Sequence, residues 1–105
     1  MPFAMIDSDE PARLQVFLDR DGEQSEVVLV DAAVVATAVL RAGGWTEEQL
    51  EVVGVTLDPG PEPHLGRWSC TLHFGAALPE DEYQRLRAAA VTALRARGYL
   101  VADEA

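Results

Sequence analysis

Two short segments alternate between apolar and polar residues with a period of two, and this pattern constrains the fold more than any other feature of the chain. The segments are residues 13–20 and 67–74. Successive side chains of a strand point to opposite faces of a sheet, so the pattern predicts two strands that each bury one face. The apolar positions are Leu14, Val16 and Leu18 in the first segment, and Trp68, Cys70, Leu72 and Phe74 in the second.

The dipeptide Asp21-Gly22 follows the first segment and is a common turn of β-hairpins. A two-residue turn there places Val16 opposite Val27, in a second strand over residues 24–30. The β-branched residues of that segment favour the same interpretation. The sequence therefore predicts a hairpin.

A helix is expected next, over residues 32–42, because Asp31 suits the N-cap position and Gly43-Gly44 tolerates the conformation that ends a helix. Its surface is apolar almost all round, which predicts that it is covered on more than one side. One long helix over residues 24–42 is the alternative to a strand followed by a shorter helix.

The second half of the chain repeats the order of strand and helix. A strand is expected over residues 51–57, and the segment 58–66 reads as a stiff loop because it holds three prolines and two glycines. After the strand at 67–74, acidic residues follow Pro79 and arginines precede Gly98. This charge order favours a helix between them. A short last strand is expected over residues 99–101.

These elements predict an α+β fold in which one antiparallel sheet carries two helices on one face, in the order ββαββα with a final β. The alternative with one long first helix gives βαββαβ, the ferredoxin-like order. We expect residues 1–11 to be a flexible acidic tail and residues 12–105 to form a single domain. The 105 residues suffice for a core without metal or disulfide.

The formal net charge of −10 bears on the kind of partner. Nucleic acid and anionic membranes attract basic surfaces, so neither is expected as a partner, whereas a basic protein is. The first residues lack the basic start and apolar run of a signal peptide, so we expect a cytoplasmic protein. All eight bases are arginine, which indicates a GC-rich genome and a bacterial source.

The residues that could carry chemistry are few. Cys70 and His73 are three apart on a predicted strand and point to opposite faces, so they cannot share a metal ion, and no metal or cofactor is expected. A binding role is therefore favoured over catalysis. A small-molecule site or small enzyme on the polar sheet face is the alternative, with candidate ligand-binding residues Arg67, Thr71, His73 and His64.

The main functional hypothesis comes from apolar residues on the side of the sheet away from the helices. The predicted interface residues are Phe17, Val28, Val30 and Val52. An exposed apolar patch with a polar rim marks an interaction site. We therefore expect a protein-binding or accessory module, such as an inhibitor or immunity-like protein, that forms a homodimer or binds a protein partner through this sheet face or through the apolar helix at residues 32–42. Cover by residues 2–6 is the alternative.

Overall fold

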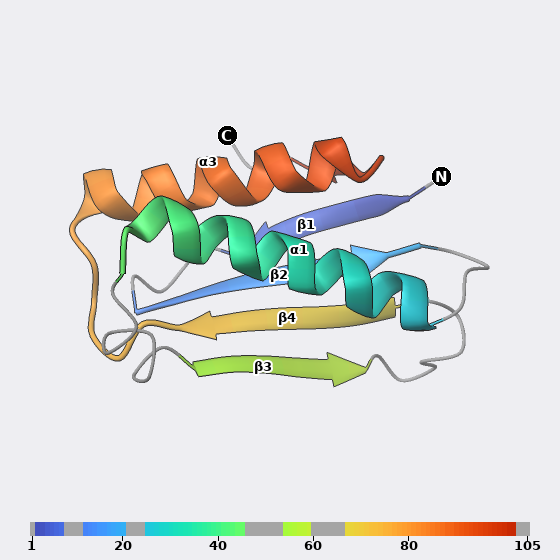
Figure 1. Cartoon of the computed structure of the whole chain (residues 1–105), viewed down its shortest axis with the longest axis horizontal. Helices are drawn as coiled ribbons and strands as arrows, with labels where there is room; N and C mark the ends of the chain where they lie inside the picture. The colour runs from blue at the N-terminus through green and yellow to red at the C-terminus, as the bar shows by residue number, and fades with distance from the viewer. Residues whose placement is uncertain (1, 8–11, 21–24, 46–53, 60–66, 103–105) are drawn as a thin grey trace.

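The computed structural model describes residues 2–7, 12–20, 25–45, 54–59 and 67–102. Within them, five strands and two long helices follow one another along the chain (Figure 1). Their order is ββαββαβ. The elements are β1 (Phe3–Asp7), β2 (Arg13–Asp19), α1 (Ser25–Gly43), β3 (Gly54–Pro59), β4 (Arg67–His73), α3 (Glu80–Ala96) and β5 (Leu100–Ala102).

The five strands form one mixed sheet in the order β3-β4-β2-β1-β5. Three of the four pairings are antiparallel, and the pairing of β1 with β5 is parallel. The fold is α+β as predicted, but the prediction of a purely antiparallel sheet is wrong. From β2 to β5 the elements follow the alternative order βαββαβ, and β1 is inserted between β2 and β5.

The N-terminal segment differs from the flexible tail that the sequence predicted for residues 1–11, because Phe3–Asp7 forms β1 inside the sheet. Ala4 and Ile6 are fully buried. Pairing on both edges satisfies the polar groups of the strand backbone, and two buried side chains add apolar contact. This segment is therefore part of the core.

The predicted strand over residues 24–30 is also wrong, because residues 25–30 are the first turns of α1. The Asp21-Gly22 turn itself lies outside the described residues. Val16 does not pair with Val27, since both edges of β2 are taken by β1 and β4, and Val16 lies between Ile6 and Cys70. No edge of β2 is left for a hairpin partner.

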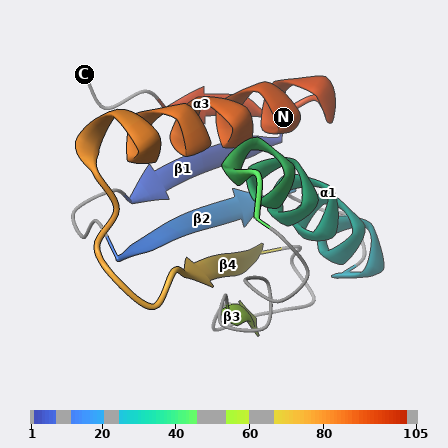
Figure 2. The ribbon, with the colours of Figure 1, turned by 60° about the vertical axis from the view of Figure 1, so that its left-hand side comes forward.

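The helices cover one face of the sheet, as the two views show (Figures 1 and 2). The first helix ends at Gly43, one residue beyond the predicted end, and Gly44 has a positive φ of 65° that favours glycine. Pro79 is the N-cap of α3 rather than its first helical residue. The buried stripe of α3 comprises Tyr83, Leu86, Ala90, Ala93 and Leu94.

Candidate functional site

The predicted ligand-binding residues that the structure describes are spread along β4. Arg67 and His73 lie at opposite ends of β4, six residues or about 20 Å apart. Arg67 forms an ion pair with Asp19, with 3.3 Å between Nε and Oδ2, and His73 Nε2 lies 3.4 Å from Thr56 Oγ1. Thr71 is only 5% exposed, and His64 lies outside the described residues. Arg67 and His73 therefore do not converge on one ligand.

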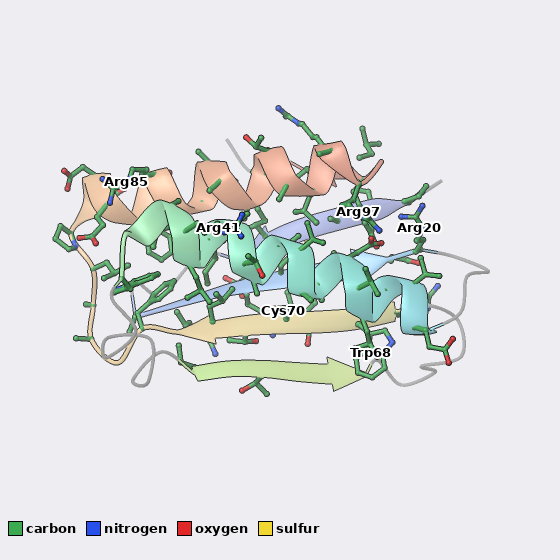
Figure 3. All side chains as sticks on the ribbon, in the orientation of Figure 1. Arg20, Arg41, Trp68, Cys70, Arg85 and Arg97 are labelled. Atoms are coloured by element: carbon green, nitrogen blue, oxygen red, sulfur yellow. The ribbon has the colours of Figure 1, made fainter. Side chains whose placement is uncertain are left out.

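Cys70 lies on β4, on the side of the sheet that the helices cover (Figure 3). It is fully buried, and burial raises the pKa of its thiol to about 11. A thiol with so high a pKa is protonated at neutral pH and is a poor nucleophile. Among the described residues, no group of three or more His, Cys, Asp or Glu side chains could hold a metal ion.

The four predicted interface residues fall in different places. Phe17 is 37% exposed and alternates with the buried Val16 and Leu18, so it lies on the face of the sheet away from the helices, which we call the open face. Val28 is a fully buried core residue of α1, and its place in the predicted interface is wrong because residues 25–30 are helical. Val30 is 54% exposed, but it lies on α1 rather than on the sheet. Val52 lies outside the described residues.

Phe17 belongs to a contiguous apolar surface that we call the sheet patch, formed by Phe3, Met5, Phe17 and Leu100. Met5 pairs directly with Phe17, and Phe3 pairs directly with Leu100, so the four side chains are neighbours across three adjacent strands. All four are among the exposed large apolar residues of the described chain. Residues 2–6 therefore do not cover Phe17 but extend the exposed surface around it.

Polar residues border the sheet patch along β2 and β4. The register places Asp19 beside Phe3, and Arg67 beside Asp19 in turn. Farther along the same face, Gln15 lies between Asp7 and Thr71. The open face is therefore divided into an apolar half over β5, β1 and β2 and a polar half toward β4.

A second apolar surface lies on the outward side of α1. Val30, Ala33, Val34 and Thr37 are exposed there, with Ala38 partly exposed and Arg41 at the C-terminal end. We call these six residues the helix stripe, and together they line a shallow, open hollow. The prediction that this helix is covered on more than one side is not met within the described residues.

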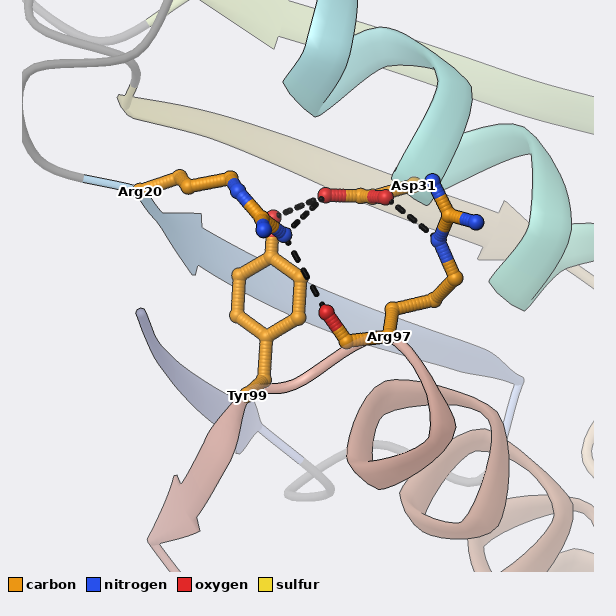
Figure 4. A network of polar contacts seen from close by, with 4 residues as sticks. All are labelled: Arg20, Asp31, Arg97 and Tyr99. Carbon is orange, nitrogen blue, oxygen red and sulfur yellow. Dashed lines mark hydrogen bonds and ion pairs between the residues drawn. The ribbon is translucent and has the colours of Figure 1, made fainter. Parts of the chain in front are cut away.

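The structure also contains a buried acid that the sequence interpretation misplaced. Asp31 is fully buried in the second turn of α1, not at an N-cap. Arg97 Nε donates to its Oδ1 at 2.7 Å, while Tyr99 Oη at 2.7 Å and Arg20 Nη1 at 3.0 Å both donate to its Oδ2 (Figure 4). The cluster therefore joins the end of β2, helix α1 and the segment between α3 and β5.

The electrostatics of this cluster fit a structural role. Burial, together with the negative charge of Asp31, raises the pKa of Tyr99, so the phenol remains a hydrogen-bond donor. Arg20 also donates to the Arg97 carbonyl oxygen at 3.1 Å and lies 5.5 Å from the centre of the Tyr99 ring. Both carboxylate oxygens of Asp31 are engaged. The arrangement leaves neither one free to act as a base.

The position of Asp31 could have been found from the sequence if the helix had been extended to residue 25. Asp31 is three positions after Val28 and four positions before Val35, which places the acid on the buried face of one helix. An acid on a buried face needs partners. Arg20 directly follows β2 and Arg97 directly follows α3, so each arginine is a candidate partner.

Comparisons of the chain with protein-family models, with curated proteins and with solved structures find no match. Neither of the two described helices is long and apolar enough to cross a membrane. The function therefore has to be argued from the surfaces themselves.

Proposed function

We propose that this chain is a non-catalytic protein-binding module and that the sheet patch is the surface that contacts the partner. The observation that supports this most is the exposure of Phe3, Met5, Phe17 and Leu100 together, on the face opposite the helices. An exposed apolar cluster favours aggregation unless a partner covers it.

The composition of the patch suits protein recognition. Phenylalanine and methionine are enriched at protein interfaces, and full burial of such a side chain stabilises a complex by about 1.5–3 kcal/mol. Because Phe17 is already nearly two-thirds buried, its own contribution lies toward the lower end. The ion pair of Asp19 with Arg67 beside the patch gives it a polar border.

The expected partner is a basic protein. The chain carries a formal net charge of −10, which attracts positive charge at long range and speeds association. The Phe17 region then makes short-range apolar contact. A second copy of the chain is the rival occupant, and it is disfavoured at long range because two copies repel each other.

The test compares three immobilised proteins: wild type, Phe17→Glu and Gln15→Glu. Both variants add one negative charge to the same face of β2, two residues apart. We expect a protein from the source cell to be retained by wild type and by Gln15→Glu but not by Phe17→Glu. After purification, that protein should bind Phe17→Glu at least about tenfold more weakly, a loss of about 1.4 kcal/mol.

Light scattering of the same three proteins identifies the rival occupant. A dimer that dissociates only in Phe17→Glu would mean that the patch binds a second copy. Equal affinity of all three proteins for every retained partner would overturn the proposal.

A further inference from the structure

The helix stripe has the form of a surface that packs against another helix. Val30, Val34 and Ala38 lie four residues apart in one row, and Ala33, Thr37 and Arg41 form a second row beside it, with the hollow between them. Rows of residues four apart are the ridges that fit into the groove of a neighbouring helix. The stripe thus offers both a ridge and a groove.

The middle of the stripe is small and has no unsatisfied polar atom that a partner must meet. Thr37 Oγ1 donates to the Ala33 carbonyl oxygen at 2.8 Å, so its hydroxyl is already bonded and its methyl group is left for contact. Small side chains at these two positions let a second helix approach closely. An apolar helix surface therefore fits here without a desolvation penalty.

The charges at the two ends of α1 indicate which helix packs against the helix stripe. Glu26 is exposed in the first turn and Arg41 in the last, 15 residues or about 22 Å apart along the axis. In an antiparallel pair of identical helices, Glu26 of each copy comes beside Arg41 of the other. A parallel pair would instead place like charges together.

We propose that α1 binds α1 of a second copy of this chain in an antiparallel, two-fold arrangement. Val30 then lies beside the second copy's Thr37, and Ala33 and Val34 lie near the two-fold axis. Such a contact is isologous, because the same surface is used by both copies. The dimer would carry its two sheet patches on outward faces, since α1 and the open face lie on opposite sides of the sheet (Figures 1 and 2).

The size of the contact predicts a weak dimer. Stable interfaces bury about 1,200–2,000 Å² in total, and the stripe extends over only about 17 Å of one helix. The net charge of −10 on each copy also opposes association. We therefore expect a reversible dimer with a Kd in the micromolar range.

Sedimentation velocity over a range of concentrations tests the proposal, with charge reversal as the perturbation. Glu26→Arg and Arg41→Glu should each raise the dimer Kd at least fivefold, because each places like charges together at both ends of the pair. The double variant should return the Kd to within about twofold of wild type, since the two charges are exchanged and remain complementary. Arg85→Glu on α3 makes the same change in net charge as Arg41→Glu, so it is the control for that variant and should leave the Kd within about twofold of wild type (Figure 3).

Three results would overturn this proposal. The first is a wild type that stays monomeric up to millimolar concentration. The second is a double variant whose dimer is no stronger than that of the weaker single variant. The third is a dimer that Phe17→Glu disrupts and Glu26→Arg does not. That last result would place self-association on the sheet patch and not on α1. The proposal for α1 can therefore be overturned without overturning the proposal that the sheet patch is a binding surface.

Discussion

The two faces of the sheet carry similar side chains but have different surroundings. On β1, Ala4 and Ile6 are fully buried, while Phe3 is 41% and Met5 is 37% exposed. These residues alternate along a single strand. The larger aromatic side chain is thus on the face that the chain leaves uncovered, which is the reverse of what maximal burial within one chain would give.

The difference shows that hydrophobicity on the two faces serves different purposes. The covered face, with both helices packed on it, contains the described core and stabilises the isolated chain. The open face contributes less to that stability, because its apolar side chains keep more than a third of their surface exposed. If this distinction is correct, neighbouring residues of one strand should respond very differently to truncation.

The largest expected effect compares Leu18 with Phe17 on β2. Leu18 is 2% exposed, so Leu18→Ala leaves a cavity and should lower the free energy of unfolding by about 2–5 kcal/mol. Phe17→Ala removes a larger side chain, but from the open face where it is only partly buried, and should cost less, about 1–2 kcal/mol. Urea denaturation followed by circular dichroism measures both. Equal losses in the two variants would show that the open face is a second core.

The next effect compares two acids that both bind arginine. Asp31 is fully buried with Arg20, Arg97 and Tyr99 around it, whereas Asp19 is 37% exposed and forms an ion pair with Arg67. Asp31→Ala should lower the free energy of unfolding by about 2–3 kcal/mol. This is less than the full loss for a buried ion pair, because both arginines remain partly hydrated.

Asp19→Ala is the matched variant and should cost less than about 1 kcal/mol, as exposed ion pairs usually do. The same urea titration serves for both variants. A loss for Asp31→Ala as small as that for Asp19→Ala would mean that the buried cluster positions the elements it joins but adds little to the free energy of unfolding.

The sequence predicts an element correctly where the local pattern of apolar and polar residues agrees with the contacts that the element makes in the fold. The strands β2 and β4 were predictable because one face of each is buried and the other is polar or exposed. The first turns of α1 were not, because the valines of residues 27–30 favour a strand locally. Their conformation is decided by β1, which takes the edge of β2 that a hairpin partner would need.

The candidate site was predictable only in part, for a related reason. Phe17 is the one large apolar residue on the polar side of β2, so its exposure follows from the alternation alone. Phe3 and Met5 alternate with other apolar residues, and no period of two is visible in β1. Their exposure depends on the register of β1 in the sheet, which is set by pairing between segments far apart along the chain.

The last effect, about as large as that of Asp31→Ala, uses the ionisation of a buried thiol to compare the two faces. Burial raises the pKa of the Cys70 thiol from an ordinary 9.0 to about 11, so the folded chain keeps this proton at a pH where the unfolded chain loses it. The resulting stabilisation is complete below pH 9 and lost as the pH rises to 11. It amounts to about 2–3 kcal/mol. Urea titrations at pH 8 and pH 11 should show this loss in wild type and a smaller one in Cys70→Ala.

Moving the thiol by one residue separates burial from the other groups that titrate in this range. Ser69 precedes Cys70 on β4 and points to the open face, so the double variant Ser69→Cys/Cys70→Ala carries its thiol on that side. Its thiolate remains hydrated, and the loss of stability between pH 8 and pH 11 should match that of Cys70→Ala alone. If the double variant instead lost as much as wild type, the open face would exclude water as the core does. The distinction between the two faces would then be wrong.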